Sequence, residues 1–234
     1  MNARARRLAP FAGYLMVALI VVVLTATGET PDAKDSGAKV IAFFTHHKTS
    51  THVADFLLAY AALAAVVYFT AVAGFLRSRG SQLLASTTIG GAVLFAAGLC
   101  VGAGINEALV DQPTRMSDSA AQTLNLLSND LFGVLMFAGL ALATTSAGIA
   151  MLRTKALPTA LGVITTIVGV AAGTGIVSWF AFLATGPLIL VTAAYVYSRS
   201  AQPTEITLPD AIPAQATAEP KTATKAKAKA TTKA

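Results

Sequence analysis

The residues best suited to chemistry in this sequence are three histidines and a few acids and amides beside long apolar runs. They are His46, His47, His52, Asp55, Glu107, Asn129 and Asp130. If one helix covers residues 47–55, then His47, Thr51 and Asp55 share a face and His52 lies three residues from Asp55. Imidazole and carboxylate groups bind divalent ions and accept protons. The pattern indicates a candidate metal or proton site at His47, His52, Asp55, Glu107 and Asp130, provided that three helices meet there.

A simpler interpretation competes with this site, and the spacing favours it. Asp55 and Asp130 each stand directly before a long apolar run, where an acid complements the positive end of a helix. Histidines in an exposed loop are usually solvated, and the spacing differs from metal signatures such as H-E-x-x-H. We therefore expect capping acids and solvated histidines at these positions rather than ion ligands.

The elements that must position these residues are membrane-spanning helices. Hydrophobic residues make up 55% of the chain and charged residues 12%, whereas a soluble domain carries about a quarter charged residues. A helix needs about 20 apolar residues to cross the hydrocarbon layer. Five uncharged runs have about that length or more, and the last one is long enough for two helices joined at Gly173-Thr174-Gly175. We predict an all-α, polytopic membrane helix bundle of about six transmembrane helices: residues 10–28, 56–76, 83–105, 131–152, 156–172 and 176–198.

Lysine and arginine are distributed unevenly between the two sides of this bundle. Alternate threading collects most of the basic residues on one side: Arg4, Arg6, Arg7, Arg77, Arg79, Arg153, Lys155, Arg199 and five tail lysines. Positively charged loops are retained in the cytoplasm. We therefore expect a multi-pass protein of the plasma (inner) membrane whose N-terminus (residues 1–9) and C-terminus are both cytoplasmic. A cleaved signal peptide is the alternative for residues 10–28, but Thr25-Ala26-Thr27 is a poor cleavage site, which favours an uncleaved anchor.

The two outer connections contain helical patterns of their own. Val40, Phe43 and Phe44 fall on one face, which predicts a helix lying at the membrane interface. Ser119 and Gln122 have capping-box spacing ahead of the fourth membrane helix. We expect both connections to lie along the outer surface.

Small residues at four-residue spacing predict close packing between the membrane helices, because apolar side chains gain nothing by leaving lipid for each other. They occur at Gly98 and Gly102, at Gly139, Ala143 and Ala147, and at Gly169 and Gly173. The single cysteine, Cys100, excludes a disulfide framework and a cysteine metal site.

The segment 199–234 changes composition to Ala, Thr, Lys and Pro. Such a sequence cannot bury a core, so we expect a disordered cytoplasmic tail. Its partners are then the lipid bilayer and anionic lipid headgroups, which its lysines attract. Specific nucleic-acid binding is not expected, because no aromatic residue stands among these lysines to stack on bases.

Part of the sequence resembles a broad group of uncharacterised bacterial multi-helix membrane proteins. The resemblance rests on Gln122-Thr123-Leu124-Asn125-Leu126-Leu127-Ser128-Asn129-Asp130-Leu131-Phe132, then Leu152-Arg153-Thr154-Lys155-Ala156-Leu157-Pro158 and Leu161-Gly162. Thr159, Ala160 and Val163 stand where that group commonly has tryptophan. The resemblance implies a multi-helix architecture and carries no activity.

No motif in the sequence names a reaction or a cofactor. There is no G-x-S-x-G, no P-loop and no dinucleotide fingerprint, and no histidine stands inside an apolar run to ligate haem. We therefore expect no catalysis and no cofactor, and a membrane-organising or regulatory role. The alternative is a small-solute or ion transporter or channel. It requires Asp55 or Asp130 to turn inward onto a cavity lined by hydroxyl groups, of which the clustered ones are Thr87, Thr88, Thr144, Thr145, Thr165, Thr166 and Ser178.

Overall fold

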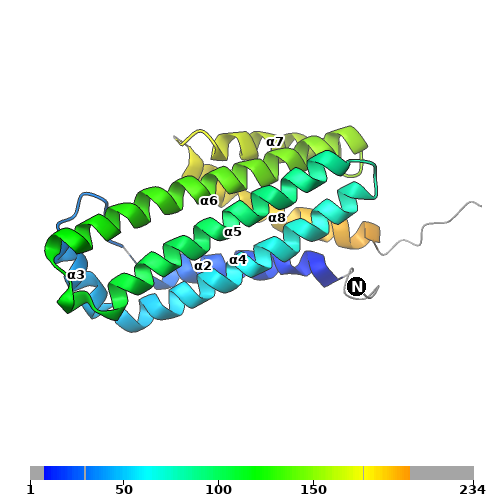
Figure 1. The fold of residues 1–234 in the computed structure, drawn as a ribbon. Coiled ribbons are helices and arrows are strands. Elements are labelled where there is room, and N and C mark those ends of the chain that lie inside the picture. Colours follow the sequence, from blue (N-terminus) through cyan, green and yellow to red (C-terminus); the bar gives the residue numbers. More distant parts are fainter. Residues whose placement is uncertain (1–7, 29, 176, 201–234) are drawn as a thin grey trace, which may run out of the picture. The chain divides into compact units, whose positions relative to one another are not determined.

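The computed structural model describes residues 8–28, 30–175 and 177–200, and every regular element within them is a helix. In chain order they are η1 (Ala9–Phe11), α2 (Ala12–Ala26), α3 (Gly37–His46), α4 (Lys48–Arg77), α5 (Gln82–Asp111), η2 (Pro113–Arg115), α6 (Asp118–Thr154), α7 (Thr159–Ala172) and α8 (Ser178–Ser200), as Figure 1 shows. Beyond Ser200, the predicted tail lies outside the described residues, as do residues 1–7.

The predicted fold class, an all-α membrane helix bundle, is confirmed. Five helical segments are long and apolar enough to cross a membrane: Ala9–Ala26, Lys48–Arg77, Gln82–Asp111, Asp118–Thr154 and Ser178–Arg199. Each contains one of the predicted apolar runs or most of it. The protein is therefore a multi-pass membrane protein with helices as its spanning elements.

The helix at the fifth predicted span, residues 156–172, is shorter than predicted. Lys155 takes a left-handed conformation with φ 48° and ends α6, and Pro158 directly precedes α7. The 14 residues of α7 rise about 21 Å, against about 30 Å of hydrocarbon. The turn after α7 lies beside α6, since Gly173 faces Ala141 there. The predicted helix and turn exist, but α7 is shorter than the predicted span 156–172, and the crossing itself stays a prediction.

Helices α4, α5 and α6 are longer than predicted, all toward the end of the bundle that carries α3. Here α4 begins at Lys48 rather than 56, α5 continues to Asp111 rather than 105, and α6 begins at Asp118 rather than 131. Figure 1 shows the three helices continuing together past α2 and α8 toward α3. We call residues 37–55 and 106–130 the cap.

Close helix packing occurs at the small residues that the sequence singled out. The contact between α5 and α6 is the most extensive in the bundle. A side chain at Gly139 would collide with the backbone of Phe95, and one at Gly98 would collide with the backbone of Met136. On the other side of α6, Gly169 of α7 lies directly against Thr145. These glycines let backbones approach where side chains would hold them apart.

Candidate functional site at the cap

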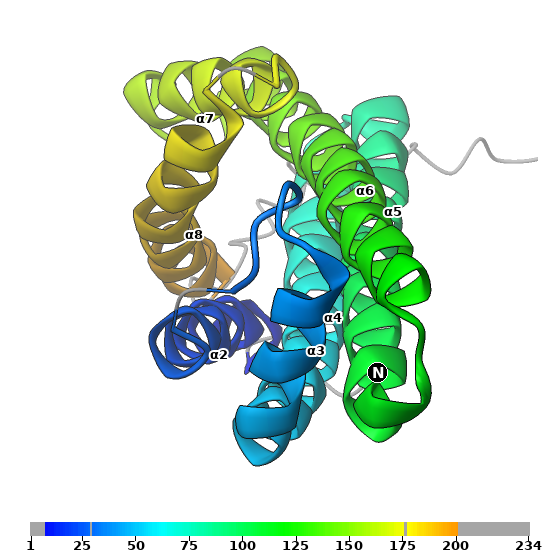
Figure 2. The same cartoon turned by 90° about the vertical axis from the view of Figure 1, so that its left-hand side faces the viewer.

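The cap has an apolar core of its own, separate from the core of the bundle. It consists of Val40, Phe44, Leu109, Val110 and Ala121, all buried. These residues come from α3, α5 and α6, so the apolar face of α3 packs on protein. Figure 2 views the bundle from this end, with α3 and the segment before it lying across α4 and α6. The predicted helix exists, but Val40 and Phe44 are covered by α5 and α6 rather than exposed to a membrane interface.

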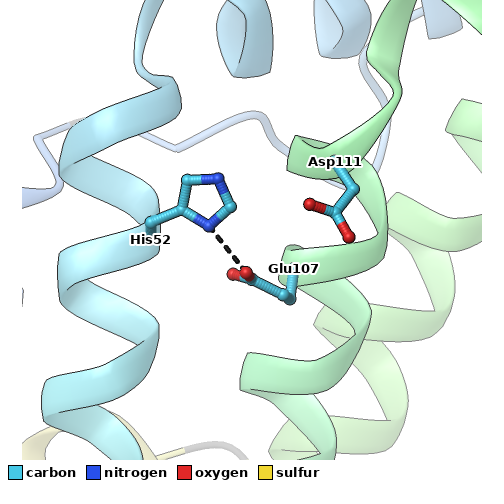
Figure 3. Close-up of side chains that lie close together, drawn as sticks. All are labelled: His52, Glu107 and Asp111. Carbon is cyan, nitrogen blue, oxygen red and sulfur yellow. Dashed lines mark hydrogen bonds and ion pairs between the residues drawn. The ribbon is translucent and has the colours of Figure 1, made fainter.

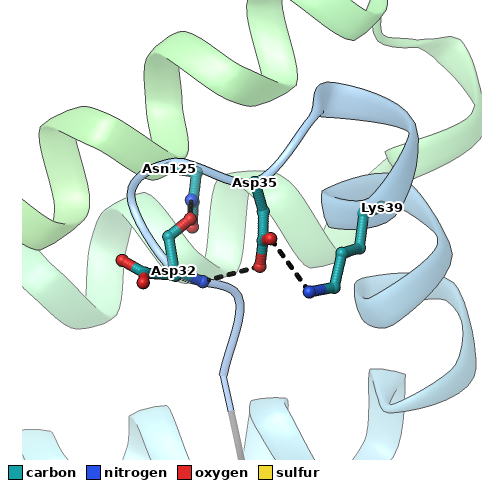
Figure 4. Close-up of polar contacts among 4 residues, drawn as sticks. All are labelled: Asp32, Asp35, Lys39 and Asn125. Carbon is teal, nitrogen blue, oxygen red and sulfur yellow. Dashed lines mark hydrogen bonds and ion pairs between the residues drawn. The ribbon is translucent and has the colours of Figure 1, made fainter.

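The segment before α3 is held by polar contacts at both its ends. The Asp35 carboxylate accepts from the Asp32 backbone N–H at 2.9 Å and from Lys39 Nζ at 2.9 Å. Asn125 of α6 donates from Nδ2 to the Asp32 carbonyl oxygen, also at 2.9 Å (Figure 4). The hydrogen bond from Lys39, assisted by the one from Asp32, lowers the pKa of the Asp35 carboxyl below its ordinary value. This turn therefore fixes where α3 begins.

Beside the cap core, a histidine and two acids converge from α4 and α5. His52 donates from Nδ1 to Oε1 of Glu107 at 2.6 Å, with side chains 27% and 36% exposed. Asp111 stands one helical turn beyond Glu107, and each of the three side chains has one potential ligand atom within 4.8 Å of the others. Figure 3 shows them facing one another across the α4–α5 interface. This arrangement offers one imidazole and two carboxylates to an ion.

A second polar layer lies one turn deeper along the same helices. Asp55 is only 7% exposed. Its Oδ1 accepts from Asn106 Nδ2 at 3.4 Å, and Asn106 Oδ1 accepts from Ser128 Oγ at 3.0 Å. Within the described part of the chain, Asp55 Oδ2 and Glu107 Oε2 are buried and have no hydrogen-bond partner. Buried oxygens without donors are costly, so this layer is short of donors or cations.

Three of the five predicted site residues come together and two do not. His52, Asp55 and Glu107 lie along the α4–α5 interface, whereas His47 and Asp130 are exposed elsewhere. The chain bends at His47 between α3 and α4, so its imidazole stacks on Phe43, with ring centroids 4.5 Å apart. His47 is nevertheless the N-cap residue of α4, since its carbonyl accepts from the Thr51 N–H at 3.0 Å. Its side chain turns back to α3 and does not join Asp55.

The predicted capping roles are also wrong, because the helices start earlier than their apolar runs. Asp55 lies well inside α4 and Asp130 well inside α6. The residue that caps α6 is Ser117, whose hydroxyl accepts from the Ala120 N–H at 3.3 Å. Ser119, expected to begin a capping box, lies within the first turn instead.

Sequence reasoning missed Asp111, and with it Asn106 and Ser128. Asp111 follows Glu107 by four residues, which puts both acids on one face if the helix continues. The predicted helix ends at residue 105, before both acids, so the prediction does not place Glu107 and Asp111 on a common helical face. Asn129, which the sequence analysis named, donates instead to the Asn125 carbonyl oxygen at 2.9 Å within its own helix.

Most hydroxyl groups inside the bundle donate hydrogen bonds to backbone carbonyl oxygens of their own helix. Thr144 donates to the Leu140 carbonyl at 2.6 Å and Thr165 to the Leu161 carbonyl at 2.7 Å. Thr88 and Ser146 join α5 and α6 through a contact of 3.0 Å. The cavity between α4, α6, α7 and α8 that Thr144 and Thr165 line has a volume of about 20 Å³. That volume holds about one water molecule.

No protein-family model, curated protein or solved structure matches this chain. The set formed by His52, Glu107 and Asp111 suits cation binding or proton exchange near the surface, and Asp55 adds a buried carboxylate below it.

Proposed function

We propose that the chain is a non-catalytic regulatory or organising component of the plasma membrane that acts through its cap. The cap carries the proposal because three helices that exceed a bilayer crossing close over a separate apolar core with α3. A helix that serves only as an anchor has no need of such an extension. A folded cap offers a partner a shaped surface, and it is continuous with the spanning helices.

The cap is proposed to face away from the cytoplasm. Arg77, Arg79, Arg153, Lys155 and Arg199 stand at or just beyond the opposite ends of the helices, as expected for the cytoplasmic side. Both termini are then cytoplasmic and the bilayer is the first partner. The tail lysines would add contacts with anionic headgroups. We also propose that the chain is a member of the bacterial group of multi-helix membrane proteins that its sequence resembles.

The transporter or channel remains the second candidate, because one observation favours it. Asp55 is turned inward, as ionisable residues on transport pathways are, and it carries a buried oxygen without a partner among the described residues. Against it, the hydroxyl-lined cavity has room for about one water molecule. A solute would need a larger opening there, so the regulatory role is preferred.

Two measurements separate these functions. A photo-cross-linking residue at Leu127, an exposed position of the cap, should give a discrete protein adduct in native membranes. The matched position is Val134, which is exposed on the same helix but inside the apolar run, and it should give lipid adducts. Purified protein in liposomes should then pass no protons, potassium or zinc above protein-free vesicles. Flux that Asp55→Asn abolishes, with no adduct at Leu127, would favour the transporter.

A further inference from the structure

We propose that His52, Glu107 and Asp111 form a binding site for one divalent transition-metal ion, with zinc as the representative ion. The site goes beyond the proposed role: it rests on the cap geometry and stands whether or not the cap binds a partner. Its three ligand atoms come from two helices and already lie within 4.8 Å of one another.

The distances suit an ion after small side-chain rotations. Ligand atoms on a tetrahedral zinc ion are about 3.4 Å apart, given bonds of about 2.0 to 2.2 Å. The 2.6 Å between His52 Nδ1 and Glu107 Oε1 must widen, while a ligand atom of Asp111 already lies within 4.8 Å of those of the other two side chains. The ion would replace the proton that these two atoms share, because a ligating nitrogen must be deprotonated. Since Asp111 is exposed, the remaining coordination position is open to water.

The local charge balance also calls for a cation. The interface holds three carboxyl groups, those of Asp55, Glu107 and Asp111, and the ion pairs of the described residues give none of them a lysine or arginine. His52 alone offers them a donor that can carry charge. Glu107 Oε2 and Asp55 Oδ2 are buried without partners within the described ranges. A divalent ion supplies the positive charge that this set lacks.

The donor set selects the class of ion. Calcium and magnesium prefer six or more oxygen ligands, whereas an imidazole with two carboxylates suits zinc and its first-row neighbours. The three ligands also match the number that zinc sites with an open position use. We therefore expect zinc to bind and magnesium to be ineffective at equal concentration.

An ion here would stiffen the cap. It would tie α4 to α5 at Glu107 and Asp111, and Leu109 and Val110 lie between those two positions in the cap core. Those two residues share that core with Val40 and Phe44 of α3. Binding of an ion would therefore tighten the packing of α3 on the cap core.

The test is a zinc titration of the purified full-length chain. The chain is purified with an affinity tag that contains no histidine, and a chelator removes any bound metal before the titration. Binding is read by competition with a chromophoric chelator and by thermal unfolding, at about pH 7.5, where free imidazole is mostly neutral. We expect one zinc ion per chain and a saturable rise in the unfolding temperature. Asp111→Asn should weaken binding by about tenfold or more, as the loss of groups that only support a ligand already costs that much. Glu107→Gln should do the same.

The controls are His47→Ala and Asp130→Asn, which remove an exposed histidine and an exposed acid outside the site. Both should bind zinc as the wild type does. Asp111 is exposed, so its variant is expected to fold, and an unchanged unfolding temperature without zinc verifies this. Absence of saturable binding in the wild type would overturn the proposal. So would binding that survives the double change Glu107→Gln with Asp111→Asn, or that is lost in either control.

Discussion

Asn125, buried in α6, donates its side-chain amide to the backbone carbonyl of Asp32 at 2.9 Å. The two residues are far apart in sequence, and the bond fastens the segment before α3 to the helix that α3 packs against. Asn129, one turn further along, bonds within its own helix instead. The Asn125 amide therefore adds a polar anchor to the apolar packing of Val40 and Phe44 in the cap core.

Replacing Asn125 with alanine should loosen α3 without disturbing the bundle. The change removes the part-buried hydrogen bond from Asn125, while the Asp32 carbonyl keeps the Asp35 N–H as a donor, so the expected loss is about 0.5 to 1.5 kcal/mol. Hydrogen exchange should show reduced protection in α3 and unchanged protection in α5 below the cap. Gln122→Ala, an exposed change on the same helix, is the control and should stay within about 0.5 kcal/mol. Equal exchange in both variants would contradict the anchoring role.

Gly139→Ala should be strongly destabilising, because its new methyl group would strike the backbone of Phe95. Two helices must then separate, which costs about 2 kcal/mol or more. Gly104→Ala on α5 meets open space and should be neutral or slightly stabilising, since alanine is the better helix former. Unfolding of both variants in mixed detergent micelles provides the comparison. A neutral Gly139→Ala would show that α5 and α6 do not pack this closely.

The turn at Asp35 should respond to acid in a defined direction. The pKa of Asp35 in the folded protein lies below the ordinary value of 3.8. The stabilisation that its ionised carboxylate gives the folded state is therefore fully present above pH 3.8 and is lost as the pH falls through the lower folded pKa. Lys39→Met removes the main cause and should move the Asp35 pKa back up. Carboxyl chemical shifts followed by NMR through the acid range measure this directly. An Asp35 pKa unaffected by Lys39→Met would mean that the pair is not formed.

Accessibility labelling should establish the orientation of the bundle. With Cys100 replaced by alanine, new cysteines at the exposed positions Ser36 and Ser119 should react with an impermeant maleimide in intact cells. One at Ser78, which is also exposed but follows α4 at the opposite end, should react only after permeabilisation. The reverse pattern would place the cap in the cytoplasm.

The bundle could be predicted from the sequence because hydrocarbon demands long uncharged runs, and these are visible without a structure. The cap could not be predicted in the same way. Residues 118–130 are largely polar, so hydropathy alone starts the helix at 131, whereas the spacing of Ser119 and Gln122 does predict a helical segment ahead of it; the structure joins both into one helix from Asp118. The burial of Ala121 and Asn125 against distant segments, which holds this extension, has no local signal.

The candidate site was predictable only in part, for a related reason. The side-chain chemistry of His52, Asp55 and Glu107 singles them out in the sequence. They can lie close together only if α4 and α5 are antiparallel neighbours, which the short connection between these helices implies. Asp111 was lost with the end of α5. His47 was included because the break between α3 and α4 carries no proline or glycine to announce it.

The 37 residues of α6 form one unbroken helix of about 55 Å, nearly twice the hydrocarbon thickness. Its backbone is continuous from the capped end at Ser117 to Arg153 at the other end of the bundle. Close contacts with α5 at Gly98 and Gly139, and with α7 at Gly148 and Gly169, lie along this helix. The cap and the spanning region therefore share one backbone and are not two parts joined by a loop.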